Sequence, residues 1–94
     1  MKNERGITMY KNKGKDGSLN ISGKKIQELR CQMSPYVSQK KLADKLQLLG
    51  LDIDKNAIQK IEAGTRFITD IELIYFAKLF NITTDELLNI QSRD

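Results

Sequence analysis

Side chains that bind nucleobases and phosphates are concentrated in two neighbouring segments of this chain. The first segment contributes Gln39, Lys40, Lys41 and Lys45, and the second contributes Lys55, Asn56, Gln59 and Lys60. A lysine ammonium donates to phosphate or to O6 and N7 of guanine, and asparagine and glutamine amides pair bidentately with adenine. The pattern therefore makes double-stranded DNA a candidate partner. The alternative is a polar helix face that touches only water.

Residue types needed for other kinds of site are missing from the sequence. Histidine, the commonest general base and zinc ligand, is absent. Cys31 is the only cysteine, which excludes an internal disulfide and a CxxC metal site. A Gly-rich phosphate loop and a convincing carboxylate pair are also absent. We therefore expect no enzyme, no metal ion and no cofactor, and we expect Cys31 to be a small, partly buried apolar residue rather than a redox switch.

The lone thiol and the apolar pattern bear on location. A single unpaired cysteine fits a reducing compartment. No apolar run approaches the length of a membrane span or a signal peptide. We therefore expect a cytoplasmic protein with no membrane partner.

Charge is distributed unevenly along the 94 residues. Residues 1–22 carry five Lys or Arg against two acids, and residues 23–66 carry nine against five. Residues 67–94 carry two against five, so their net charge is −3 although the whole chain has +4. The basic N-terminal part and the acidic C-terminal part of the chain predict that one face of the protein meets a polyanion.

The elements that must position these side chains are predicted to be helices. Residues 1–22 contain three Gly and four Lys without a sustained apolar period, which predicts a flexible, disordered basic arm. From Gly23 the apolar spacing becomes helical, and we expect one all-α domain of five helices over residues 23–90. The residues expected to face inward on the first four helices are Ile26, Leu29, Arg30 and Met33; Leu42, Ala43, Leu46 and Leu49; Ile58 and Ile61; and Leu73, Phe76, Ala77 and Phe80.

Capping signals set the expected helix ends. A second helix begins near Ser38 and ends at Gly50, and the segment 51–53 is a short linker. Asp54 is placed to begin a third helix over residues 55–63, which Gly64 would end. Two Thr-x-x-Glu capping boxes, at residues 69–72 and 83–86, open the fourth and fifth helices.

Four short motifs follow one another in an order that is more specific than any one of them alone. They are Ile26-Gln27-Glu28-Leu29-Arg30, Ser38-Gln39-Lys40-Lys41-Leu42-Ala43, Ile58-Gln59-Lys60-Ile61-Glu62-Ala63-Gly64 and Asn81-Ile82-Thr83-Thr84-Asp85-Glu86-Leu87-Leu88. Together they resemble the Cro and phage-repressor type (XRE family) of helix-turn-helix transcription regulators. The resemblance implies a five-helix repressor-like domain whose helix 55–63 enters the major groove.

Three features depart from the family pattern, and one of them is a slightly longer loop over residues 34–37. The segment between Ala43 and Ile58 is longer than usual, so either the second helix runs further or the turn after it is looser. Asn81 stands where the family usually has a glycine, and asparagine adopts the left-handed conformation less cheaply.

The resemblance also implies roles for individual residues. Gln39 would bind a phosphate and brace the recognition helix, Asn56 and Gln59 would read base edges, and Lys60 would bind phosphate or guanine. The remaining expected DNA contacts are Lys40, Lys55, Thr65 and Arg66. Arg66 could instead pair with Asp70. Arg30 and Glu62 stand where the family has a partly buried ion pair, a structural role.

Three functions stay open from the sequence. The favoured one is a sequence-specific DNA-binding transcription regulator, expected to be a repressor. The alternatives are a DNA-binding antitoxin, whose arm would neutralise a partner toxin, and a protein-interaction module on the same fold. A polar and basic face over residues 55–60 argues against the last.

A homodimer is the expected assembly. Two recognition helices about 34 Å apart would meet successive major grooves on one side of the duplex. The interface must leave the basic face free, which points to the acidic C-terminal half. The candidate interface residues are Ile74, Tyr75, Ile82 and Ile90. A strip formed by Ile71, Ile74 and Tyr75 would be either an interaction patch or a surface packed within the chain.

Overall fold

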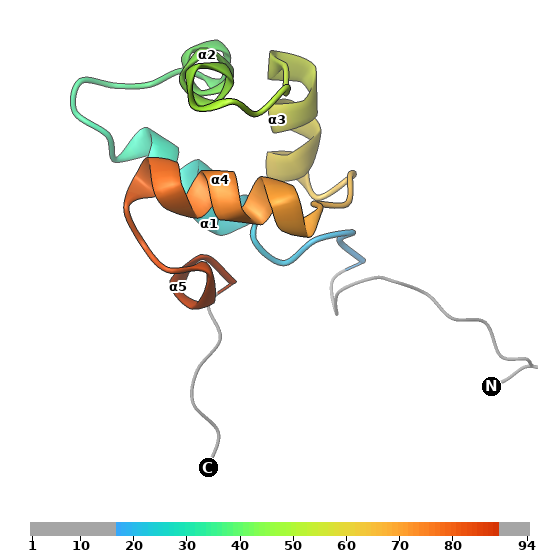
Figure 1. The fold of residues 1–94 in the computed structure, drawn as a ribbon. Helices are drawn as coiled ribbons and strands as arrows, with labels where there is room; N and C mark the ends of the chain where they lie inside the picture. Colours follow the sequence, from blue (N-terminus) through green and yellow to red (C-terminus); the bar gives the residue numbers. More distant parts are fainter. Residues whose placement is uncertain (1–16, 89–94) are drawn as a thin grey trace, which may run out of the picture.

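The computed structural model describes residues 17–88, which form five helices and no strand. In chain order the helices are α1 (Gly23–Cys31), α2 (Gln39–Leu49), α3 (Lys55–Ala63), α4 (Asp70–Phe80) and α5 (Thr84–Leu88). In Figure 1, α2 and α3 lie on one side of α1 and α4, and α5 lies on the other. The all-α expectation is confirmed for this part of the chain. Most of the expected arm, and Ile90, lie outside the described residues.

One apolar core joins all five helices. Its fully buried side chains are Ile26, Leu42, Leu46, Ile58, Ile61, Phe76 and Leu87. Contacts run from α3 to both α1 and α2, and from α4 to α2 and α5. Because α3 is held from the inside by two helices, its outer face is left without a neighbour among these elements.

Local capping fixes where the helices begin. The side chains of Ser38 and Asp54 each accept a hydrogen bond from the backbone amide three residues later. Thr69 and Glu72 form a complete capping box, and the motif that begins at Thr83 exchanges the same two hydrogen bonds. Each of these starts was predicted from sequence and is confirmed.

Left-handed residues end three of the helices. Gly50 (φ 110°) follows α2 and Gly64 (φ 80°) follows α3, as predicted. Asn81 (φ 58°) follows α4 and takes the left-handed conformation that favours glycine. Asparagine is one of the few other residues that adopt this conformation routinely, so Asn81 can end α4.

The connection between α2 and α3 corrects one prediction about the core. Leu49 was expected to face inward but is 45% exposed, whereas Leu51 and Ile53 of the expected linker are buried. The turn at Gly50 ends the helical period, and the extended chain beyond it then points alternate side chains inward. The Gln47 side-chain amide also donates to the Ile53 carbonyl at 2.6 Å. The connection between α2 and α3 is therefore held in place by two buried side chains and one side-chain hydrogen bond.

Cys31 is a second correction. It was expected to be partly buried, but the thiol is exposed and free. Arg30, one residue earlier on α1, is buried and takes the inward direction. Since successive helical residues are rotated by about 100°, Cys31 is turned towards solvent at the end of the helix.

Candidate nucleic-acid interface

The outer face of α3 gathers four of the predicted contact residues. Lys55, Asn56, Gln59 and Lys60 are all exposed. Ile58 and Ile61 lie on the opposite face with no exposed surface. Glu62, the one acid within α3, is buried. The exposed face of α3 therefore presents two ammonium groups and two amides without a carboxylate of its own.

An ion pair fixes the inner side of α3 against α1. Arg30 donates from Nε and Nη2 to the two carboxylate oxygens of Glu62 at 2.8 and 2.9 Å. Both side chains are almost completely covered. The hydrogen bond to Glu62 outweighs burial and raises the pKa of Arg30. The ion pair expected here is confirmed, and it is bidentate, the geometry that best fixes direction.

The same pair joins α3 to the start of α2. Gln39 donates from Nε2 to Glu62 Oε1 at 3.0 Å, so the bracing contact expected of Gln39 is present. Arg30 also donates from Nη1 to the Val37 carbonyl and the Tyr36 hydroxyl, each at 3.1 Å. The Gln39 amide carries a second hydrogen, which could donate to a ligand.

A shallow concavity of about 410 Å³ lies where α2 and α3 begin. The residues that line it are Arg30, Tyr36, Ser38, Gln39, Lys40 and Lys55. Lys40 is 3.1 Å from Asp44 in an exposed pair one helical turn apart. Such pairs are worth only about 0.3–0.5 kcal/mol, so a stronger anion can displace Asp44. Two lysines and a glutamine thus line a concavity at the start of α2, and these are groups that can bind a phosphate.

The segment before α1 anchors the far end of α3, a contact that the sequence analysis missed. Leu19 donates its backbone N–H to the Gly64 carbonyl at 2.8 Å. The Asn20 side chain donates to the carbonyls of Ile61 and Arg66 at 3.0 and 2.8 Å. Its Oδ1 accepts from the Gly23 amide at 2.6 Å. Residues 17–22 were assigned to the arm, but they pack on the domain.

One local signal could have suggested part of this arrangement. Asn20 precedes Gly23 by three residues, the spacing at which an asparagine side chain caps a helix amide. The two bonds across to α3 have no such signal, because their partners lie more than forty residues away. Gly23 itself is required here, since a Cβ would collide with the Ile61 carbonyl.

Thr65 and Arg66 follow α3 and are held by contacts within the chain. The Thr65 hydroxyl lies 3.4 Å from the Lys60 carbonyl. Arg66 donates from Nη1 and Nη2 to the two carboxylate oxygens of Glu72 at 3.0 and 2.9 Å. The suggested partner Asp70 is therefore wrong, and Glu72 takes its place. Arg66 remains partly exposed, so it can reach an anion only by sharing its guanidinium.

The Arg66 pair changes the acidity of both partners. The hydrogen bond to Glu72 raises the pKa of Arg66 despite its partial burial. Burial alone would raise the pKa of Glu72, but hydrogen bonds from Arg66 and Thr69 outweigh it, and the pKa falls below its ordinary value. The Glu72 carboxylate therefore stays charged in mildly acidic solution.

Exposed apolar side chains on and just before α4 form a second candidate surface. Ile71 and Ile74 are 60% and 51% exposed. Tyr75 and Ile82, two of the other expected interface residues, are partly buried against the core. Phe67, just before α4, is 51% exposed. Tyr75 and Ile82 are therefore less open to a partner than expected. The exposed apolar residues of this region are Phe67, Ile71 and Ile74.

Within residues 17–88, no helix is long and apolar enough to cross a membrane. The same part of the chain holds no group of three or more potential metal ligands. Comparison with protein-family models, with curated proteins and with solved structures found no match to this chain.

Proposed function

We propose that this chain is a sequence-specific DNA-binding transcription regulator of the Cro and phage-repressor type. In this proposal α3 enters the major groove and reads bases through Asn56 and Gln59. The observation that carries it is the outer face of α3, where Lys55, Asn56, Gln59 and Lys60 are all exposed. Amides of this kind pair with adenine, and lysines bind guanine or phosphate.

The rigid mounting of α3 supports the proposal. Base readout needs a helix whose position is fixed before binding, because each bidentate contact depends on sub-ångström placement. The Arg30–Glu62 pair holds one side of α3, and Asn20 holds its end. These contacts leave the outward side chains free for a ligand.

The start of α2 supplies a matching place for the DNA backbone. Ser38, Gln39 and Lys40 surround the concavity that also receives Lys55. A phosphate there would meet backbone amides at a helix start and two ammonium groups. Phosphate contacts fix the register of a protein on the duplex, and base contacts from α3 would then supply specificity.

A homodimer completes the proposal. One helix of nine residues covers only a few base pairs, so a pair of domains is needed for a useful operator affinity. The exposed strip of Phe67, Ile71 and Ile74 is the surface we assign to the two-fold contact. Light scattering over a dilution series tests this, and Ile74→Glu should lower the measured mass if the strip is the interface.

The test of DNA binding is selection of bound sequences from a random pool, followed by affinity measurements on the selected site and on scrambled DNA. Asn56→Ala and Gln59→Ala should each cost roughly 1–3 kcal/mol on the selected site and little on scrambled DNA. Gln27→Ala, which removes an exposed amide from α1, is the matched control and should change neither affinity. Failure to enrich any sequence, or equal losses on both DNAs, would contradict base reading by α3.

The basic residues 1–16 lie outside the described part of the chain, and we propose that they add non-specific affinity. Five Lys or Arg stand against two acids there. Deleting them should flatten the dependence of log affinity on log salt concentration, because fewer counterions are released. The deletion should stop before Gly17, since Leu19 and Asn20 hold α3. An unchanged salt slope would contradict this role.

A further inference from the structure

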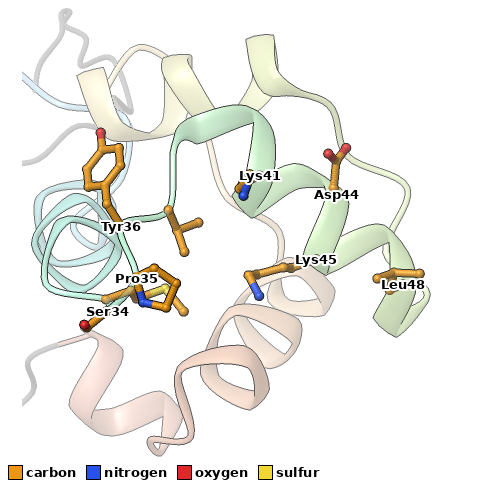
Figure 2. A pocket seen from close by; sticks show the side chains of 9 residues that line it. Ser34, Pro35, Tyr36, Lys41, Asp44, Lys45 and Leu48 are labelled. Carbon is orange, nitrogen blue, oxygen red and sulfur yellow. The ribbon is translucent and has the colours of Figure 1, made fainter.

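A groove with apolar walls runs between the α1–α2 connection and the outer side of α2 (Figure 2). Its volume is about 470 Å³, enough for one or two large side chains. Met33, Pro35 and Val37 form one wall, and Leu48 closes the other. Leu48, in the last turn of α2, is 88% exposed. This groove is separate from the face of α3.

The rim of the groove is positively charged. Lys41 and Lys45 line it, and within residues 17–88 neither ammonium has an ion-pair partner. The one acid beside them, Asp44, is paired with Lys40. In Figure 2, Lys45 reaches towards Pro35, whereas the Asp44 carboxylate points away from it. An occupant therefore meets two ammonium groups around an apolar floor.

The walls of the groove are held in place before anything binds. The Tyr36 hydroxyl accepts a hydrogen bond from Arg30, and the Val37 carbonyl accepts another. Arg30 is itself locked by Glu62. A preformed wall lowers the ordering cost of binding.

We propose that this groove docks an acidic amphipathic helical segment of a partner protein. Lys41, Lys45 and Leu48 follow one another at i, i+4 and i+7, so they form one strip along about two turns of α2. A helix laid beside this strip would place a leucine or phenylalanine on the apolar floor and glutamates or aspartates against the two ammonium groups. The groove lies apart from the face of α3 and borders the concavity at the start of α2, because Tyr36 lines both.

The experiment is an NMR titration of the ¹⁵N-labelled chain without DNA. The probe is a synthetic peptide of about three helical turns that carries leucines at i and i+4 with glutamates beside them. We expect saturable shifts at Tyr36, Lys41, Lys45 and Leu48 with a Kd on the order of 0.1 mM. Lys45→Glu and Leu48→Ser should each weaken binding about tenfold or more.

Matched controls distinguish binding in the groove from non-specific binding of the peptide. Leu49→Ser changes an exposed leucine of the same helix that does not line the groove, and Lys78→Glu reverses a charge on α4. Both variants should bind the peptide as the parent does. A peptide with lysines in place of the glutamates should not bind.

Several results would overturn the proposal. They are no saturation at about 1 mM peptide, equal binding of the lysine peptide, or shifts confined to Phe67, Ile71 and Ile74. Groove shifts on dilution of the protein alone would assign the site to a second copy of the chain. Shifts at Lys45 and Leu48 caused by a DNA fragment in place of the peptide would assign the groove to nucleic acid, whereas a shift at Tyr36 alone would report the neighbouring concavity.

Discussion

Two arginine–glutamate pairs flank α3, and the protein covers them to different degrees. Arg30 and Glu62 have side chains only 6% and 2% exposed, whereas Arg66 and Glu72 are 32% and 11% exposed. Both pairs are bidentate and nearly equal in length. A charge that is buried away from water is strongly destabilising when its partner is removed. Loss of the Arg30–Glu62 pair should therefore lower stability more than loss of the Arg66–Glu72 pair, although the two are alike in geometry.

The buried pair also connects more of the molecule. Glu62 accepts from both α1 and Gln39 of α2, so three helices meet at one carboxylate. Glu72 accepts from Arg66 and from the backbone of its own helix start. The first pair thus sets the position of α3, and the second closes a local turn.

Breaking the buried pair should have the largest effect. Arg30→Met leaves the Glu62 carboxylate buried without its main partner, and we expect it to lower the free energy of unfolding by about 3–5 kcal/mol. Urea unfolding measures this. The double variant Arg30→Met/Glu62→Leu should recover much of the loss, because no buried charge remains. A loss below about 1 kcal/mol for the single variant would contradict the comparison.

Releasing the end of α3 should have an intermediate effect. Asn20→Ala removes two hydrogen bonds to α3 and its loop and one to α1, and we expect a loss of about 1–3 kcal/mol. Asn20→Asp keeps the acceptor for the Gly23 amide but loses both donors, so it isolates the contacts with α3. Amide hydrogen exchange should then rise near Gly64. A stability like that of the parent for both variants would show that residues 17–22 do not anchor α3.

Breaking the partly exposed pair should cost less. Arg66→Ala is expected to lower stability by at most about 1 kcal/mol, since solvent screens the guanidinium and the Thr69 amide still donates to the Glu72 carboxylate. The same urea measurement places it beside Arg30→Met. A loss equal to that of Arg30→Met would remove the distinction between the two pairs.

Acid should act on the Glu72 pair in a defined direction. The pKa of Glu72 is lowered in the folded protein, so its contribution is present above the ordinary value of 4.5 and is lost as pH falls below that value through the folded pKa. Stability followed from pH 6 downwards, against Glu72→Gln as reference, measures this contribution. The gap between parent and variant should narrow below about pH 4.5. A gap that stays constant to pH 3 would contradict the assignment.

Breaking the exposed Lys40–Asp44 pair should have the smallest effect on stability. Asp44→Asn should change stability by no more than about 0.3–0.5 kcal/mol. Under the proposed function it should also free Lys40 and leave DNA affinity equal or slightly higher. Thermal unfolding and binding to the selected DNA site check the two expectations separately. A clear loss of DNA affinity would indicate that Asp44 has a role beyond this pair.

Local chemistry in the sequence was enough to locate the helices and the candidate face. Ser38 and Asp54 cap neighbouring amides, and Gly64 ends α3, because each acts within one helical turn. The spacing of Ile58 and Ile61 fixed which side of α3 turns inward, and with it the exposure of Asn56 and Gln59. Contacts of such short range depend little on the rest of the fold.

Only the tertiary structure decided which distant groups meet. Asn20 belongs to a segment whose sequence predicts a flexible arm. It nevertheless binds α3 and the loop after it, whose residues are more than forty positions away in the sequence. Arg66 pairs with Glu72 rather than with Asp70. Glu72 lies at the third position of α4, and the capping box turns its side chain back towards the helix start. Leu51 replaced Leu49 in the core once Gly50 redirected the chain. Such choices depend on where the backbone of one element passes another, and that is set by the packing of the whole core.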